Sequence, residues 1–438
     1  MEKPNIIFIL TDQQRHDTCG CYGQELDITP NLDNMAEEGV KFTNCFSCQP
    51  LCGPARASLQ TGLYSTQTGV FRNGIKLRPF NKTIAHYLTE IGYKVGYIGK
   101  WHLSGMKSGI VPIKYRGGYN DFWLGSNALE FTSRPYEGHV FDKDNNKVEF
   151  KGQYRVDFLT DRALDYLDNH DPNNPFFLFI SYLEPHHQNE KVIGGHFQGP
   201  KGSKEKFKDF ETPKDLEGLK GNWEKEIPDY LGCCHNIDEN LKKIQNKLDD
   251  LNISDSTIVI FTSDHGCHFK TRNSEYKRTC HEGAVHIPLI IKGPGFEGGK
   301  EINELVGLID LPPTILNIAG ISKPSQMQGN YLQDLIAGKV EEWPEEIFIQ
   351  ISESHVGRAI RTKKWKYSVR APHKIGFVHS KSKTYREDFL YDLENDPYEK
   401  NNLVESADYI DIRAKLAELL KKKMKVGGEK VPKIIPNG

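Results

Sequence analysis

Long apolar runs alternate with amphipathic segments along the first part of the chain. Runs with little polar alternation are typical of strands buried on both faces of a parallel sheet that helices cover. The expected buried strands lie at residues 5–10, 93–98, 175–182 and 257–262. The expected crossover helices lie at residues 33–39, 83–92, 157–169 and 230–248. This alternation predicts an α/β fold with a large mixed, mostly parallel sheet between helices.

The pattern changes near residue 346, where short segments separated by turns begin. Strands are expected at 347–351, 357–362, 365–369 and 389–393, with a final helix at 410–424. We therefore predict a main domain over residues 1–345 and a C-terminal subdomain with a small antiparallel sheet over residues 346–438. Two irregular polar segments, 105–155 and 188–228, are expected to form insertions and a rim around a pocket.

The composition of the chain bears on its binding partners and on its cellular location. The chain has 438 residues with 57 basic and 59 acidic side chains, so we expect no broad nucleic-acid or acidic-membrane surface. No apolar run is long enough to span a membrane. Residues 1–4 lead directly into an apolar strand without the features of a signal peptide. Nine cysteines favour a reducing compartment, so we expect the cytoplasm, or the periplasm or a secreted location if a leader was removed.

Polar side chains follow the apolar runs where the expected strands end. Asp12 and Gln13 follow the first strand, and Asp264 and His265 follow the strand at 257–262. In open α/β sheets ligands gather beyond the carboxyl ends of strands, so these side chains are candidates for holding a hard cation. For a single Asp after a strand, a helix N-cap is the simpler interpretation.

The segment at residues 49–62 is typical of a turn that runs into a short helix. Gly53 and Pro54 open it, since proline is tolerated in a first helical turn. Cys52 then lies at the helix N-terminus, where free backbone N–H groups favour anions. Arg56 lies four residues on, on the same helix face. This arrangement suits a sulfate or phosphate group; a buried cysteine at an ordinary helix start is the alternative.

A metal cluster is a rival interpretation of the same cysteine. Cys45, Cys48 and Cys52 have a spacing that could provide three ligands of a zinc or iron–sulfur site. No second C-x-x-C pair completes such a set, which argues against a cluster.

The sequence C-x-P-x-R at residues 52–56, followed by S-L-x-T-G at 58–62, resembles the signature of the type I sulfatases. This formylglycine-dependent family belongs to the alkaline-phosphatase-like superfamily. The usual signature is C-x-P-S-R, and Ala55 replaces its serine here. The resemblance continues along nearly the whole chain. It implies that a formylglycine-generating maturation enzyme oxidises Cys52 to formylglycine, whose hydrate is the nucleophile.

The resemblance also implies catalytic roles at other strand ends. Lys100 would bind a sulfate oxygen, and His102 would take a proton when the enzyme intermediate breaks down. His186 would contact the sulfate and the leaving oxygen, and Lys277 would bind sulfate oxygens near the leaving group. Arg56 would join the lysines in neutralising the sulfate oxygens.

By the same resemblance, an oxygen-rich set of residues holds a divalent cation. The implied ligands are Asp12, Gln13, Cys52 in its oxidised form, Asp264 and His265. Oxygen ligands suit Ca²⁺ or Mg²⁺, and the histidine makes Mn²⁺ another candidate. We expect Ca²⁺.

Side chains outside the general motif are candidates for substrate recognition. Glu184, His187 and Gln188 flank the catalytic histidine of their strand. A satisfied loop histidine is an equally good interpretation of His187. In the C-terminal subdomain, His355 and Arg358 could line the far side of the pocket, although a solvated basic strand explains them as well.

We therefore expect a sulfatase that hydrolyses a sulfate ester. A sulfated carbohydrate is the first choice of substrate, because polar and aromatic residues crowd the inserted segments. A phosphonate monoester or phosphodiester hydrolase of the same fold is an alternative. A protein that binds sulfated glycans without turnover is a second alternative, which applies if Cys52 is never oxidised.

Overall fold

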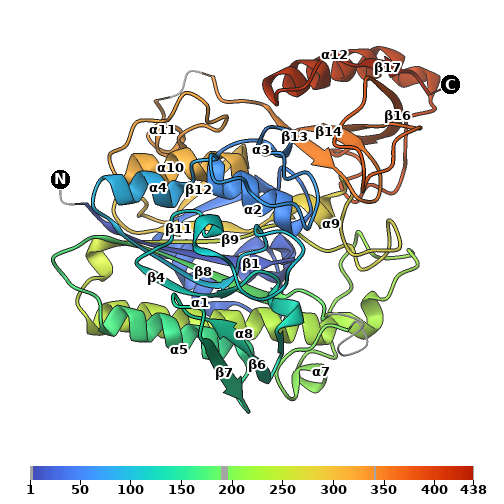
Figure 1. The fold of residues 1–438 in the computed structure, drawn as a ribbon. Coiled ribbons are helices and arrows are strands. Elements are labelled where there is room, and N and C mark those ends of the chain that lie inside the picture. Colours follow the sequence, from blue (N-terminus) through green and yellow to red (C-terminus); the bar gives the residue numbers. More distant parts are fainter. Residues whose placement is uncertain (1–2, 189–195, 340–341, 438) are drawn as a thin grey trace.

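The computed structural model describes residues 3–188, 196–339 and 342–437, and its main element is a 12-stranded sheet (Figure 1). The central strand β1 (Asn5–Asp12) pairs in parallel with β8 (Phe176–Pro185) and β9 (Thr257–Ser263). β8 also pairs in parallel with β3 (Lys94–Lys100), and β3 pairs with β4 (Phe122–Ser126). These neighbouring strands run in one direction, so their carboxyl ends meet at one edge of the sheet.

The remaining strands extend this sheet on both sides. They are β2 (Val40–Phe46), β10 (His286–Ile287), β11 (Leu289–Lys292) and β12 (Lys300–Gly307) beyond β9, and β5 (Ser133–Arg134), β6 (Glu137–Phe141) and β7 (Lys147–Lys151) beyond β4. Antiparallel pairs join β11 to β9 and β6 to β4. The segment expected to form irregular insertions therefore contributes strands to the sheet.

Helices cover both faces of the sheet (Figure 1). They are α1 (Pro30–Glu38), α5 (Arg155–Asp168) and α8 (Trp223–Asp250) on one face, and α2 (Cys52–Thr61), α4 (Ile84–Glu90) and α10 (Leu311–Ile318) on the other. Ile6 and Phe8 of β1 belong to one hydrophobic core, and Ile7 and Ile9 belong to the other. The run is apolar throughout because both faces of the strand are buried.

The helix α8 begins seven residues before the expected position at residue 230. The charged residues of its first turn did not indicate a buried helix. Glu226 in this turn is nevertheless buried, and it accepts a hydrogen bond from the backbone N–H of Phe197. The shorter helices are α3 (Ser65–Thr68), α7 (Ser203–Lys206), α9 (Glu282–Val285) and α11 (Leu332–Ile336). Part of the expected rim, residues 189–195, lies outside the described residues.

A separate five-stranded sheet forms the C-terminal part of the chain (Figure 1). Its strands are β13 (Glu346–Ile351), β14 (Gly357–Thr362), β15 (Trp365–Arg370), β16 (Thr384–Asp392) and β17 (Lys433–Ile435). The first four pair antiparallel, whereas the unexpected β17 pairs in parallel with β16. α12 (Ile410–Val426) packs on this sheet. The predicted fold class is confirmed, and the domain boundary at 345/346 stays a prediction.

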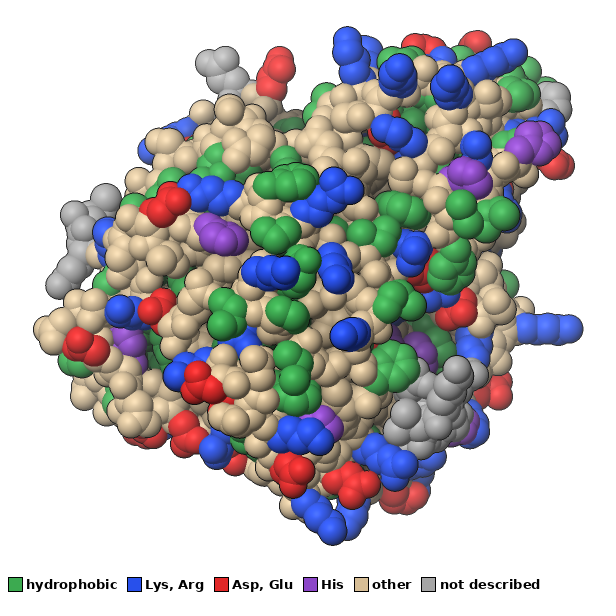
Figure 2. All heavy atoms as spheres, viewed as in Figure 1, with side chains coloured by type: hydrophobic (Ala, Val, Ile, Leu, Met, Phe, Trp, Pro, Cys, Tyr) green, Lys and Arg blue, Asp and Glu red, His purple; other side chains and the backbone are tan. Residues whose placement is uncertain are grey.

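Charged and apolar side chains are interspersed over the face shown in Figure 2. This distribution agrees with the balanced charge of the sequence. Among the described residues, no helix has both the length and the apolar character that a membrane crossing requires.

Candidate active site

Five buried polar side chains meet at the carboxyl edge of the parallel strands. Asp12 ends β1, Lys100 ends β3, and His186 directly follows β8. Asp264 follows β9, and Cys52 is the first residue of α2. Each is less than one-tenth exposed. The four that end or follow strands come together because those strands run in the same direction.

Four side chains at this edge form a compact group of ligands. The ligand atoms of Asp12, Cys52, Asp264 and His265 all lie within 4.8 Å of one another. His265 Nε2 lies 3.6 Å from Asp12 Oδ1 and 3.4 Å from Asp264 Oδ1. The backbone N–H of Gln13 donates to Asp264 Oδ1 over 3.2 Å. Gln13 has a φ of 76°, a conformation that costs free energy for a residue with a side chain.

The electrostatics of this group favour a bound cation. Burial and the nearby charge of Asp12 raise the pKa of Asp264. Burial also opposes ionisation of Asp12, but Lys100 and other cationic neighbours hold its pKa well below the usual range. The carboxylates and the histidine suit Ca²⁺, Mg²⁺ or Mn²⁺. Cys52 Sγ is the fourth atom of this ligand group.

The Arg56 side chain points inward and holds the two carboxylates. Its Nε donates to Asp264 Oδ2 over 3.0 Å, and its Nη2 donates to Asp12 Oδ2 over 3.2 Å. Its Nη1 donates to the Lys100 carbonyl and to Ser181 Oγ, at 2.8 and 2.6 Å. These bonds occupy four of the five guanidinium N–H groups. Two of these donors hold the carboxylates of Asp12 and Asp264, so Arg56 positions potential ligands of a cation, and its expected role in neutralising sulfate oxygens stays a prediction.

The Cys52 sulfur lies among cationic and histidine side chains. Lys277 Nζ is 3.0 Å from Cys52 Sγ and 3.3 Å from Gln13 Oε1. His265 Nε2 is 3.3 Å from the same sulfur. Burial would raise the pKa of the Cys52 thiol, but Lys100 and then Lys277 outweigh this effect and lower it well below its ordinary value. The structure thus brings the predicted lysines to the predicted nucleophile position.

Both predicted catalytic histidines also reach Cys52. Interaction with His102 contributes to the lowered pKa of the Cys52 thiol, and interaction with Cys52 partly offsets the lowering of the His186 pKa. His102 has a φ of 62°, and its Nδ1 has no hydrogen-bond partner. His186 Nδ1 lies 2.6 Å from the carbonyl oxygen of His187, so we assign its proton to Nδ1. Burial lowers the pKa of His186, which favours its neutral form.

One acidic residue of the site escaped prediction. Lys100 Nζ lies between Asp12 Oδ2 at 2.7 Å and Glu130 Oε1 at 3.2 Å. Burial opposes ionisation of Glu130, but Lys100 and then His102 outweigh it and lower its pKa. Glu130 lies in a short 3-10 helix (Leu129–Phe131) inside the segment expected to be an irregular insertion. No spacing signal marked it, because its partner is distant in sequence.

Glu184 and Gln188 have internal partners. Arg155 donates to Glu184 Oε1 over 3.0 and 2.7 Å from its Nε and Nη2, and to Gln188 Oε1 over 3.4 Å. All three side chains are buried. This arrangement fixes the loop that carries His186. Glu184 Oε2 and Gln188 Nε2 are buried without a hydrogen-bond partner, so a role of either residue in substrate binding stays a prediction.

His187 packs between two rings. Its ring centroid lies 4.4 Å from that of His186 and 4.4 Å from that of Tyr276. Burial lowers its pKa well below the ordinary value. The ring is packed, but its buried Nδ1 has no hydrogen-bond partner, so both interpretations of His187 stay predictions.

Arg358 is buried within the C-terminal subdomain. Its Nε and Nη2 donate to Glu429 over 2.6 and 3.0 Å, and its Nη1 donates to the carbonyl of Gly357. Since each of its nitrogens is engaged there, the structure does not support the expectation that it holds substrate. His355, whose Nδ1 lies 3.1 Å from Ser354 Oγ, stays an untested candidate.

The three-cysteine cluster is not formed. The only group of three or more potential metal ligands found among the described residues contains Cys52 but neither Cys45 nor Cys48. Cys45 belongs to the main-domain core and Cys48 to the core of the C-terminal subdomain. Burial raises the pKa of both thiols, as expected for packed, unreactive cysteines.

Strand ends of a mostly parallel sheet that gather two carboxylates, two lysines and a helix-start cysteine define a hydrolase of the alkaline-phosphatase-like fold. The chain belongs to the sulfatase family: the family described as Sulfatase matches residues 4–321. A second family, described as N-sulphoglucosamine sulphohydrolase, C-terminal, matches residues 274–426. The protein is therefore a sulfuric ester hydrolase.

Individual relatives agree with this assignment. An ulvan-active sulfatase of Formosa agariphila is 30% identical, over 98% of this chain and 82% of the relative. An N-acetylglucosamine-6-O-sulfatase of Bacteroides thetaiotaomicron is 25% identical, over 97% of this chain and 87% of the relative. A crystal structure of the putative sulfatase yidJ from Bacteroides fragilis superposes with a TM-score of 0.85 at 25% identity, covering 98% of this chain and 97% of that one.

Proposed function

We propose that the protein hydrolyses a sulfate ester of a sulfated carbohydrate, with formylglycine formed from Cys52 and with Ca²⁺ as the bound cation. The observation that carries this proposal is the position of Cys52, whose sulfur lies 3.0 Å from Lys277 Nζ and 3.3 Å from Nε2 of His265, a member of the ligand group. The two relatives named for ulvan and for N-acetylglucosamine 6-O-sulfate support a carbohydrate substrate.

The cation, held by Asp12, Gln13, Asp264, His265 and the oxidised Cys52, would act as a Lewis acid and lower the pKa of the nucleophilic hydroxyl. The hydrated formylglycine would supply two hydroxyls, one to attack sulfur and one to restore the aldehyde. A cysteine thiol offers no second hydroxyl, so oxidation is required for turnover.

The remaining residues supply charge and move protons. Lys100 and Lys277 place two ammonium groups beside the nucleophile, where they stabilise negative charge on the sulfate oxygens. Because His186 carries its proton on Nδ1, its Nε2 is free to accept a hydrogen bond but has no proton to give. We therefore assign donation to the departing alcohol to Lys277, and proton acceptance from the second hydroxyl to His102.

The experiment combines mass analysis with activity assays. The protein is co-produced with a formylglycine-generating enzyme. The mass of the tryptic peptide that contains Cys52 is then measured, since formylglycine is lighter than cysteine. Sulfate release is then measured on ulvan oligosaccharides, N-acetylglucosamine 6-O-sulfate and p-nitrophenyl sulfate, beside an aryl phosphodiester. Turnover of a sulfated sugar that Cys52→Ala abolishes supports the proposal. A preference for the phosphodiester, or an unmodified Cys52 with binding but no turnover, contradicts it.

A further inference from the structure

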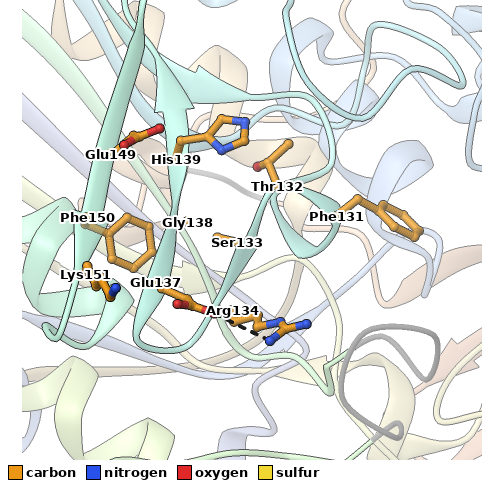
Figure 3. A pocket seen from close by; sticks show the side chains of 10 residues that line it. All are labelled: Phe131, Thr132, Ser133, Arg134, Glu137, Gly138, His139, Glu149, Phe150 and Lys151. Atoms are coloured by element: carbon orange, nitrogen blue, oxygen red, sulfur yellow. Dashed lines mark hydrogen bonds and ion pairs between the residues drawn. The ribbon is translucent and has the colours of Figure 1, made fainter.

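A cavity lies outside the catalytic group, at the corner of the sheet that β5, β6 and β7 form. Its volume is about 590 Å³. Figure 3 shows it with side chains from the turn before β5 on one side, from β7 on the other, and Gly138 of β6 between them. We call this cavity the corner groove; its lining residues are Phe131 to Arg134, Glu137 to His139, and Glu149 to Lys151.

Two chain connections join the corner groove to the catalytic group. Phe131 directly follows Glu130, whose carboxylate lies 3.2 Å from Lys100 Nζ. One peptide step and one glutamate side chain separate them, so the groove begins within about 12 Å of that ammonium group. On its other side, Ser133 Oγ accepts a hydrogen bond of 2.9 Å from Arg155, which also binds Glu184. The corner groove therefore adjoins the residues that hold Lys100 and Glu184.

The chemistry of the corner groove fits an uncharged, hydroxyl-rich ring. Phe131 is 53% exposed and offers an aromatic face, while the buried Phe150 is part of the lining. The lining also contains positively and negatively charged side chains, and the exposed Arg134 and Glu137 lie 3.5 Å apart. Such a surface offers both hydrogen-bond donors and acceptors without net charge. It suits a sugar, whose C–H face stacks on the aromatic ring and whose hydroxyls bond the rim, better than an apolar chain or a polyanion.

We propose that the corner groove binds a further sugar unit of the glycan chain that carries the scissile sulfate ester. The inference rests on the proposed function, since it assumes a carbohydrate substrate. It assigns Phe131 as the residue that stacks on this unit. It also gives the enzyme a preference for sulfated oligosaccharides over small sulfate esters, because only an oligosaccharide occupies both the catalytic group and the corner groove.

The test compares Phe131→Ala with wild type on two probes. One is p-nitrophenyl sulfate, whose single ring is too short to reach the groove from the catalytic group. The other is a sulfated ulvan oligosaccharide. We expect kcat/KM for the oligosaccharide to fall roughly five- to tenfold relative to kcat/KM for p-nitrophenyl sulfate, as loss of one aromatic stacking contact predicts. Phe80→Ala is the matched control, since Phe80 is 74% exposed and lies outside the groove.

A direct binding measurement separates this inference from the proposed function. Desulfated ulvan oligosaccharide is titrated against wild type and Phe131→Ala, followed by calorimetry and by the melting temperature of each variant. Binding that Phe131→Ala weakens and Phe80→Ala leaves intact supports the inference, even if no sulfate ester is hydrolysed and the proposed function fails. An unchanged ratio of kcat/KM values, or equal binding by both variants, overturns the inference while sulfatase activity stands.

Discussion

The inward orientation of Arg56 leads to a prediction that separates two roles for this residue. Arg56→Lys keeps the positive charge but removes the planar fork that reaches both Asp12 and Asp264. A lysine ammonium is a compact donor and cannot reproduce this bridge. If Arg56 positions the carboxylates, its replacement by lysine should weaken binding of the cation as well as catalysis.

The contacts set the size of the effect. Arg56 is 2% exposed, so a carboxylate that loses its guanidinium partner stays buried without replacement by water. Loss of one hydrogen bond to a charged group costs about 1.5–3 kcal/mol. Since about 1.4 kcal/mol corresponds to a factor of ten, the affinity for Ca²⁺ and kcat should each fall roughly 10- to 150-fold.

The assay follows the melting temperature as Ca²⁺ is added to metal-free protein, because a ligand that binds the folded state raises it. Sulfate release from p-nitrophenyl sulfate gives kcat. Arg116→Lys is the matched control: Arg116 is equally buried at 2% exposure, but it donates to backbone carbonyls and to Asn145. This control should lose stability without a change in the affinity for Ca²⁺.

Two outcomes would refute the reasoning. If Arg56→Lys binds Ca²⁺ as tightly as wild type while kcat falls, Arg56 acts on the sulfate itself, as the family resemblance implied. If both quantities stay within about threefold of wild type, far below the loss expected for one charged hydrogen bond, the contacts to Asp12 and Asp264 contribute nothing that lysine lacks.

Three further predictions concern the cation, pH and the C-terminal subdomain. EDTA should lower the melting temperature and abolish sulfate release, and Ca²⁺ should restore both, because a cation that binds the folded state stabilises it; an unchanged melting temperature would contradict this. Burial lowers the pKa of His268 to about 4 from an ordinary value of 6.5. Between these values the unfolded chain binds more protons, so stability falls as pH falls through this window. Between pH 7 and pH 4, the free energy of unfolding measured with urea should therefore fall by roughly 3 kcal/mol less in His268→Gln than in wild type. An equal fall in both proteins would argue against this. Glu429→Gln should lower the free energy of unfolding by about 3–5 kcal/mol, because it leaves the buried Arg358 without its charged partner; a loss below about 1 kcal/mol in the same unfolding assay would mean that the pair is not needed.

The strand-end residues were predictable because two local signals coincide there. In β1, β8 and β9 an apolar run stops abruptly at polar residues, and burial of both faces explains why the run is unbroken. Parallel pairing then brings these ends together without further information. Asp12 and Asp264 are neighbours for this reason. Gln13, next to Asp12, donates its backbone N–H to Asp264 across a separation of 251 residues.

Side-chain direction was not predictable in the same way. The helical spacing places Cys52 and Arg56 on one face of α2, which the structure retains. It does not say whether that face turns its guanidinium toward an external anion or toward carboxylates of the protein. The answer depends on how α2 docks over the ends of β1 and β9, which is a property of tertiary packing.

The position of Glu130 shows why an acidic residue in an irregular segment can escape prediction and still matter. The cationic groups near Cys52 are balanced by an equal number of carboxylates: Arg56, Lys100 and Lys277 against Asp12, Asp264 and Glu130. Without Glu130 the chain itself would carry an excess positive charge at this edge of the sheet. With it, three acidic side chains offset three cationic ones, so a cation bound as proposed would add to the attraction of Lys100 and Lys277 for an anionic ester. Under the proposed function Glu130 would therefore make substrate binding depend more strongly on the cation, a contribution that no spacing in the sequence could reveal.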